Sequence, residues 1–239
     1  MNDKITYIGH STIFVEAANS VTVAVDPWLE GNPLCPNELK RPEGISVIAL
    51  THGHSDHASS AASLAKANQS TVCAIWELAM LMKKEGVADS KLQPMNKGGT
   101  VEIPGSGGLK VSLTNAFHSS SFDASDGNTY YAGEACGVVL ELPSGKTIYH
   151  AGDTCLFTDM EYIGRTFRPD VALLPIGDRF TMGPKQAADA VRLIKPRAVI
   201  PIHHSTFDLL SGTPEQFKQV LAGEDVECIV LAPGESFSL

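Results

Sequence analysis

Residues 51–57 read Thr51-His52-Gly53-His54-Ser55-Asp56-His57, and this segment decides both the expected fold and the expected chemistry. Imidazole nitrogens and carboxylate oxygens are ligands for Zn²⁺, Mn²⁺, Fe²⁺ and Ni²⁺. Because His52 and His54 are two residues apart, they point the same way in extended backbone. Asp56 and His57 then turn away toward the start of a helix. Four ligand-type side chains are too many for one ion with an open position, so the segment predicts two metal ions.

The surroundings of this motif indicate an α/β protein. The apolar run at residues 45–50 precedes the motif and reads as a strand covered on both faces. Short stretches rich in β-branched residues fill the first 25 residues, and later segments alternate between strand-like and helix-like patterns. We therefore expect a layered α/β fold in a single domain spanning residues 1–239. The motif lies at the end of a strand, where such folds place their sites.

Further ligand-type side chains follow other predicted strands. His118 ends one strand and opens the Ser-rich segment 119–133, which we expect to be a long loop. Asp153 ends another strand, and its two carboxylate oxygens could bridge two cations, which no imidazole can do. His203 and His204 follow a late strand, and one of them should be a ligand.

Composition excludes several classes of function. The chain of 239 residues has a net charge of −9, so it would repel the phosphates of nucleic acids and anionic membranes. Its apolar runs are strand-sized, far below the roughly 20 residues of a membrane span, and its first residues lack a signal-peptide pattern. Five cysteines without a close pair fit reduced thiols. We expect a cytoplasmic protein that binds a small-molecule substrate, and neither nucleic acid nor membrane.

The order of these residues resembles that of the metallo-β-lactamase-fold hydrolases. The shared pattern is His-x-His-x-Asp-His, a single histidine, a Gly-Asp pair and a histidine after a late strand, and it covers almost the whole chain. Gly9-His10-Ser11, Asp26-Pro27-Trp28 and residues 177–184 are similar to one branch, the metal-dependent hydrolases related to the L-ascorbate-6-phosphate lactonase. The resemblance implies a four-layer αββα sandwich with the metal ions at one edge of its two sheets.

The resemblance also implies a ligand set for each ion and one carboxylate shared by both. The first ion would be held by His52, His54 and His118, the second by Asp56, His57 and His203, and both by Asp153. His203 is preferred to His204 because it takes the family's place after Pro201-Ile202. Many relatives have tyrosine at the position of His204, which leaves this histidine as a candidate for substrate contact or proton transfer. The expected cofactor is a pair of Zn²⁺ ions, with Mn²⁺, Ni²⁺ or Fe²⁺ as alternatives.

Other polar side chains are candidates for orienting the ligands or contacting the substrate, namely His10, Asp26, Asp178, Arg179 and His204. Metal-bound imidazoles usually donate their other N–H to a carboxylate or carbonyl. Asp26, at the end of an apolar strand, and Asp178 are the candidate carboxylates. Arg179 lies just before an expected helix start, where a cation and a helix N-terminus could bind an anionic group.

These features predict a metal-dependent hydrolase. A metal pair lowers the pKa of a bound water from about 15.7 toward neutrality, and Asp56 and Asp153 would act as the catalytic carboxylates that orient it. The expected substrate is a small, polar, anionic ester or lactone. The alternative enzyme is a phosphodiesterase acting on a small or lipid-like substrate. The alternative of another class is a catalytically idle sensor or scaffold that binds metal. The resemblance also allows a homo-oligomer.

Overall fold

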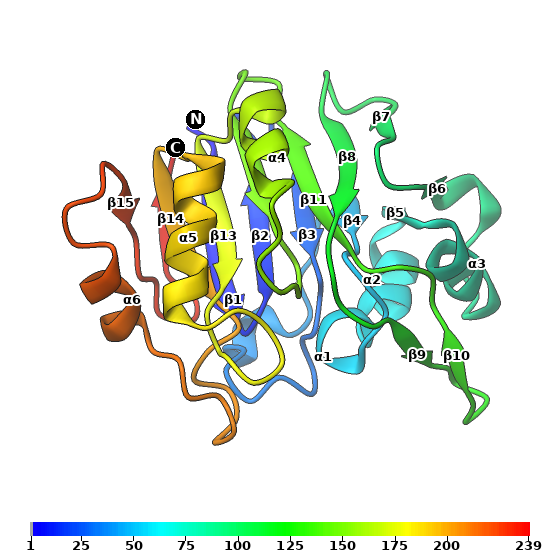
Figure 1. Cartoon of the computed structure of the whole chain (residues 1–239). Helices are drawn as coiled ribbons and strands as arrows, with labels where there is room; N and C mark the ends of the chain where they lie inside the picture. The colour runs from blue at the N-terminus through cyan, green and yellow to red at the C-terminus, as the bar shows by residue number, and fades with distance from the viewer. Residues whose placement is uncertain (1) are drawn as a thin grey trace.

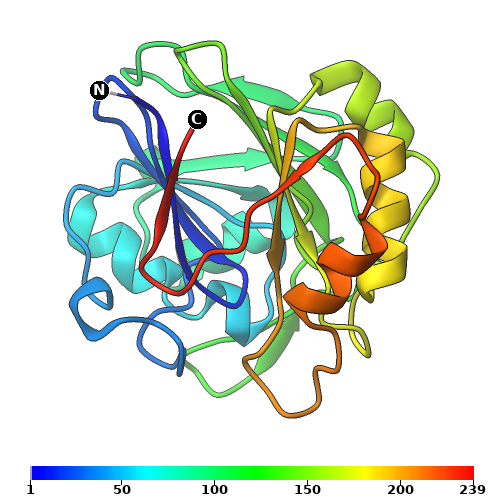
Figure 2. The ribbon, with the colours of Figure 1, turned by 90° about the vertical axis from the view of Figure 1, so that its left-hand side faces the viewer.

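The computed structural model describes residues 2–239 and places two seven-stranded sheets face to face, with helices on their outer sides (Figures 1 and 2). The first sheet has the order β16 (Ser236–Ser238), β1 (Lys4–Gly9), β2 (Thr12–Glu16), β3 (Thr22–Val25), β4 (Val47–Ala49), β5 (Thr71–Ile75) and β6 (Leu92–Met95). The second has the order β15 (Glu227–Cys228), β14 (Ala198–Ile202), β13 (Val171–Pro175), β12 (Thr147–His150), β11 (Cys136–Glu141), β8 (Lys110–Asn115) and β7 (Thr100–Glu102).

Helices cover both sheets. The first sheet is accompanied by α1 (Ser55–Ala58), α2 (Ala61–Asn68) and α3 (Trp76–Lys84), and the second by α4 (Met160–Phe167), α5 (Pro184–Ile194) and α6 (Pro214–Val220) (Figure 2). Single 3₁₀ turns occur at Asn37–Leu39 and Asp89–Lys91. Within residues 2–239, no helix is long and apolar enough to cross a membrane. The arrangement confirms the predicted four-layer αββα sandwich.

Alternation along the central strands explains why the second sheet is buried on both faces. Val138 and Leu140 of β11 belong to the core between the sheets, whereas Val139 packs in the core under the helices. Leu173 of β13 likewise points into the sandwich while Ala172 faces α4 and α5. Successive side chains of a strand point to opposite faces. A nearly continuous apolar strand therefore contributes side chains to both cores.

Parallel pairing gathers the ends of several strands at one edge. β3, β4 and β5 are parallel neighbours in the first sheet, and β12, β13 and β14 are parallel neighbours in the second. Their carboxyl ends therefore lie together, as is usual for the ligand-binding edge of α/β folds. The chain places Asp26 after β3, His52 after β4, Asp153 after β12 and His203 after β14.

The expectation of a long loop at residues 119–133 was wrong. This segment contains a small hairpin of β9 (Ser121–Asp123) and β10 (Thr129–Tyr131), paired in antiparallel register. The composition misled because the polar, glycine-containing residues form only the turn. The aromatic residues on either side of that turn are good strand formers. The hairpin borders α1, which carries part of the His-rich motif.

Close packing of α4 on α5 generates a stability prediction. A Cβ placed on Gly164 would overlap the carbonyl oxygen of Ile194. Alanine favours an isolated helix over glycine by about 1 kcal/mol, but here the overlap forces the helices apart. We expect Gly164→Ala to lower the free energy of unfolding by about 1–3 kcal/mol, measured by denaturant titration. Arg165→Ala, an exposed change on the same helix, should stay within about 0.5 kcal/mol. A Gly164→Ala variant as stable as the wild type would contradict the packing.

Candidate metal centre

The buried carboxylate of Asp26 orients the motif. Its Oδ1 accepts a hydrogen bond from the backbone N–H of Thr51 at 2.8 Å. Its Oδ2 accepts from the Thr51 hydroxyl at 2.6 Å and from Nδ1–H of His57 at 2.8 Å. A carboxylate without access to water requires donors of this kind. In the neutral imidazole, a hydrogen on Nδ1 leaves Nε2 of His57 with a free lone pair that can bind a metal ion.

The same carboxylate acts on His52 through Thr51. The Thr51 hydroxyl has one hydrogen, which it donates to Asp26, so it accepts from Nδ1–H of His52 at 3.0 Å. His52 and His57 are both fully buried, so a hydrogen on Nδ1 of each ring leaves Nε2 as its possible ligand atom. This is the state in which an imidazole binds a metal while its other nitrogen is held by a hydrogen bond.

Two groups of ligand-type atoms correspond to the predicted sets, and a third consists of Asp26, His52 and His57. Those of His52, His54 and His118 all lie within 4.8 Å of one another. Those of Asp56, His57 and His203 form a second such group, which His10 joins. Within the first group, Nε2 of His52 lies 3.0 Å from Nδ1 of His54. The structure thus brings the predicted histidines together as two neighbouring clusters.

Asp153 lies between the two clusters. Its Oδ2 is 3.1 Å from Nε2 of His203 and 3.6 Å from Nε2 of His118, and its Oδ1 is 3.4 Å from Nε2 of His57. Burial alone would raise the pKa of this carboxyl, but the imidazoles of His203 and His57 hold it well below its usual range. The preceding Gly152 has a φ of +63°, and a Cβ there would lie 2.7 Å from Thr51, so glycine allows this close approach.

These side chains fit divalent metal ions. Among the buried atoms without a hydrogen-bond partner are Nε2 of His57 and Oδ1 of Asp153, both of which face the clusters. Unpaired buried polar atoms are rare and call for a partner. Imidazole nitrogens and carboxylate oxygens facing one another are a donor set suited to Zn²⁺ and related ions. The residues predicted as ligands could therefore hold divalent metal ions of this kind.

His10 lies closer to the second ligand group than the sequence indicated. Burial lowers its pKa to about 4, so the ring is neutral near pH 7. Its Nδ1 lies 2.9 Å from the Thr206 hydroxyl and its Nε2 lies 3.2 Å from Oδ2 of Asp56. When Thr206 donates to the carbonyl of His204, 3.1 Å away, Nε2 of His10 is bare and can join the second ligand group. When Thr206 donates to His10 instead, Nε2–H holds Asp56 in place.

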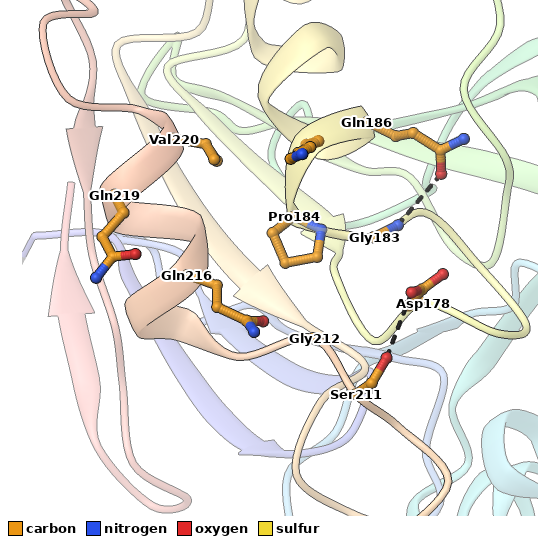
Figure 3. Close-up of a pocket in the computed structure, with 10 residues that line it drawn as sticks. Asp178, Gly183, Pro184, Gln186, Ser211, Gly212, Gln216, Gln219 and Val220 are labelled. Carbon is orange, nitrogen blue, oxygen red and sulfur yellow. Dashed lines mark hydrogen bonds between the residues drawn. The ribbon is translucent and has the colours of Figure 1, made fainter.

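Three predicted residues lie apart from the clusters. Asp178 accepts a hydrogen bond from Ser211 at 3.3 Å and lines a separate pocket of about 570 Å³ beside the first turns of α5 and α6 (Figure 3). His204 is buried and stacks on Tyr7, with ring centres 6.2 Å apart. Arg179 is exposed, with its guanidinium 5.4 Å from the centre of the Phe180 ring.

A small pocket of about 240 Å³ opens onto the clusters. It is lined by His54, Asp56, His118, Ser119, Asp153, Phe180, His203 and Phe207. Sequence reasoning missed Ser119, Phe180 and Phe207 in this lining, and it missed the linking role of Thr51. Thr51 and Ser119 directly precede or follow predicted ligands, which was a usable signal. Nothing in the local sequence pattern marks Phe207.

Comparison with known proteins identifies the family. Residues 21–204 match the family described as the Beta-lactamase superfamily domain. The chain belongs to the β-lactamase superfamily. This superfamily member is 44% identical over 234 residues to a UPF0173 metal-dependent hydrolase of Rubrobacter xylanophilus, covering 97% of this chain and 95% of the relative. It is 43% identical over 239 residues to a UPF0173 metal-dependent hydrolase of Methanosarcina barkeri, covering 99% and 98%.

The solved structures agree with this assignment. This protein superposes with a TM-score of 0.85 on Igni18, a metallo hydrolase from the archaeon Ignicoccus hospitalis. The two share 33% sequence identity over 100% of this chain and 99% of the other. The metallo-β-lactamase fold predicted from the motif is confirmed, and so is the prediction of a metal-dependent hydrolase.

The role of Asp26 in this superfamily member yields a prediction about metal affinity. In Asp26→Asn, an amide NH₂ faces the Thr51 hydroxyl and His57, so His57 must accept at Nδ1 and carry its hydrogen on Nε2. We expect metal affinity to fall about 10- to 100-fold, measured by titrating metal-free protein with Zn²⁺. Asp178→Asn is the matched control and should bind metal as the wild type does. Equal affinities for all three proteins would refute this role of Asp26.

Proposed function

We propose that this metal-dependent hydrolase uses two divalent metal ions to hydrolyse a small ester or lactone. The observation that carries the proposal is the convergence of three imidazole nitrogens on Asp153, at 3.1–3.6 Å, from both ligand groups. A carboxylate shared in this way is the feature expected of a two-ion site rather than a one-ion site. Zn²⁺ is the proposed ion, because the first group consists of imidazoles alone.

The chain's own carboxylates have distinct positions in the proposed reaction. Bound ions of this kind supply an activated water and a positive charge for the substrate oxygen. Asp153 is almost fully buried, so it acts by holding its histidine neighbours and the water in place. The Asp56 side chain is 28% exposed and lines the pocket. It is therefore the carboxylate that can contact both the attacking water and the substrate.

The pocket supports an ester or lactone over a phosphodiester. Its volume of about 240 Å³ is below the usual range for drug-sized ligands, which favours a small substrate. None of the described lining residues is lysine or arginine, the side chains that normally accompany phosphate recognition. A negative charge on the substrate would be met by the metal ions. The resemblance to the branch related to the L-ascorbate-6-phosphate lactonase also supports a lactone.

The proposed ligand set predicts a contrast between two adjacent histidines. We expect about two equivalents of metal per chain in the purified wild type, measured by elemental analysis. His203→Ala removes a ligand of the second ion and should retain about one equivalent. His204→Phe keeps a ring stacked on Tyr7 and should retain about two. If His204→Phe loses metal and His203→Ala does not, the assignment of the second ligand group is wrong.

The proposed reaction predicts a dependence on metal and on Asp56. We expect the wild type to hydrolyse simple lactones or aryl esters, to lose activity after chelation and to regain it with Zn²⁺ or Mn²⁺. Asp56→Asn should lower kcat at least about 100-fold. The panel should include bis(p-nitrophenyl) phosphate. Turnover of this compound alone would favour a phosphodiesterase, and metal-loaded protein without any turnover would favour an idle sensor or scaffold.

A further inference from the structure

We propose that Phe180 and Phe207 form an apolar subsite that binds an aromatic or branched alkyl group of the substrate beside the metal ions. The inference rests on the proposed function, because the reacting group must be held at the metal centre. It adds to that function the chemical class of the part of the substrate that does not react. Both rings line the pocket that opens onto the ligands. Phe180 is 49% exposed and Phe207 is 41% exposed.

Phe207 is held in its exposed position. Its ring stacks on Trp28, with centres 5.9 Å apart, and meets the edge of His10 at 5.5 Å. Trp28 itself is buried. The preceding Thr206 is tied to His10 through the 2.9 Å contact with Nδ1. One face of the Phe207 ring is therefore packed on fixed neighbours, which leaves the rest of the ring available to a ligand without loss of side-chain freedom on binding.

Phe180 is presented by an unusual turn. Asp178 and Arg179 have φ angles of +63° and +55°, a conformation that residues with side chains seldom adopt. The turn is closed by the N–H of Asp178 donating to the carbonyl of Met182 at 3.0 Å. Met182 is buried and donates in turn to the carbonyl of Thr154 at 3.1 Å. Backbone of this kind persists where the surroundings impose it, and it clusters at functional sites.

The remaining lining determines which chemistry the two rings can serve. Apart from the proposed ligands, the described lining consists of Phe180, Phe207 and Ser119. The part of a substrate that does not touch the metal ions thus meets two phenyl rings and a single hydroxyl. Phenyl rings favour apolar and above all aromatic partners. The two rings come from the turns after β13 and β14, which are neighbouring parallel strands, so one ligand group can contact both.

The test separates binding from hydrolysis by using two carboxylates as probes. Acetate and phenylacetate share the carboxylate that would bind the metal ions and differ by one phenyl ring. We expect Zn²⁺-loaded wild type to bind phenylacetate at least about 10-fold more tightly than acetate, measured by calorimetry. In Phe180→Ala and Phe207→Ala this preference should fall about 5- to 10-fold, with acetate affinity unchanged. Tyr162→Ala, which removes an exposed aromatic ring on α4, should keep the full preference.

Several outcomes would overturn the subsite. These are no preference for phenylacetate in the wild type, an equal loss of affinity for both probes in the variants, or a change of oligomeric state with the preference intact. The last result would show that the two rings form a contact between copies of the chain. A preference that depends on both rings would support the subsite even if no ester or lactone were hydrolysed. In that case the hydrolytic proposal alone would fail.

Discussion

The site depends on one buried carboxylate that is fully occupied by donors. Asp26 accepts from the backbone and hydroxyl of Thr51 and from His57, and this pattern fixes the hydrogens of two imidazoles at once. His57 is fixed directly and His52 through Thr51. The parallel pairing of β3 with β4 makes the contact possible, because it brings the residues after both strands together. A feature of the sheet thereby positions the Nδ1 atoms of two metal-ligand candidates.

Each half of the chain contributes side chains that are costly to bury without a partner. The first sheet supplies the His-rich motif, and the second supplies Asp153 and His203, which meet it across the sandwich edge. Several of their buried atoms lack hydrogen-bond partners. Bound cations would satisfy these atoms, so metal binding and folding stability are expected to be coupled. We expect the convergence that leaves these atoms unpaired without metal to provide the ligand set when metal is bound.

The sequence was most informative where spacing alone determines geometry. Ligand-type residues within the motif and at predicted strand ends were enough to predict the fold, and the structure brings the predicted histidines close together. The sequence was less informative where the position of a side chain depends on segments that are distant along the chain. Asp178 lies in the turn after β13 and was predicted as a carboxylate partner for a metal-bound imidazole. The turn directs its side chain to another pocket instead. Phe207 lines the pocket with its ring supported by Trp28 and His10, which are far away in the chain.

The turns that carry the two aromatic rings also contact the proposed ligands. The N–H of His203 donates to the carbonyl of His10 at 2.7 Å, and a Cβ on Gly177 would overlap the carbonyl oxygen of His203. Both turns therefore contact His203, a residue of the second ligand group. In the proposed reaction, the aromatic subsite and the ligands would be held in place by the same packing. A substrate group bound between the two rings would then lie next to the residues that hold the metal ions.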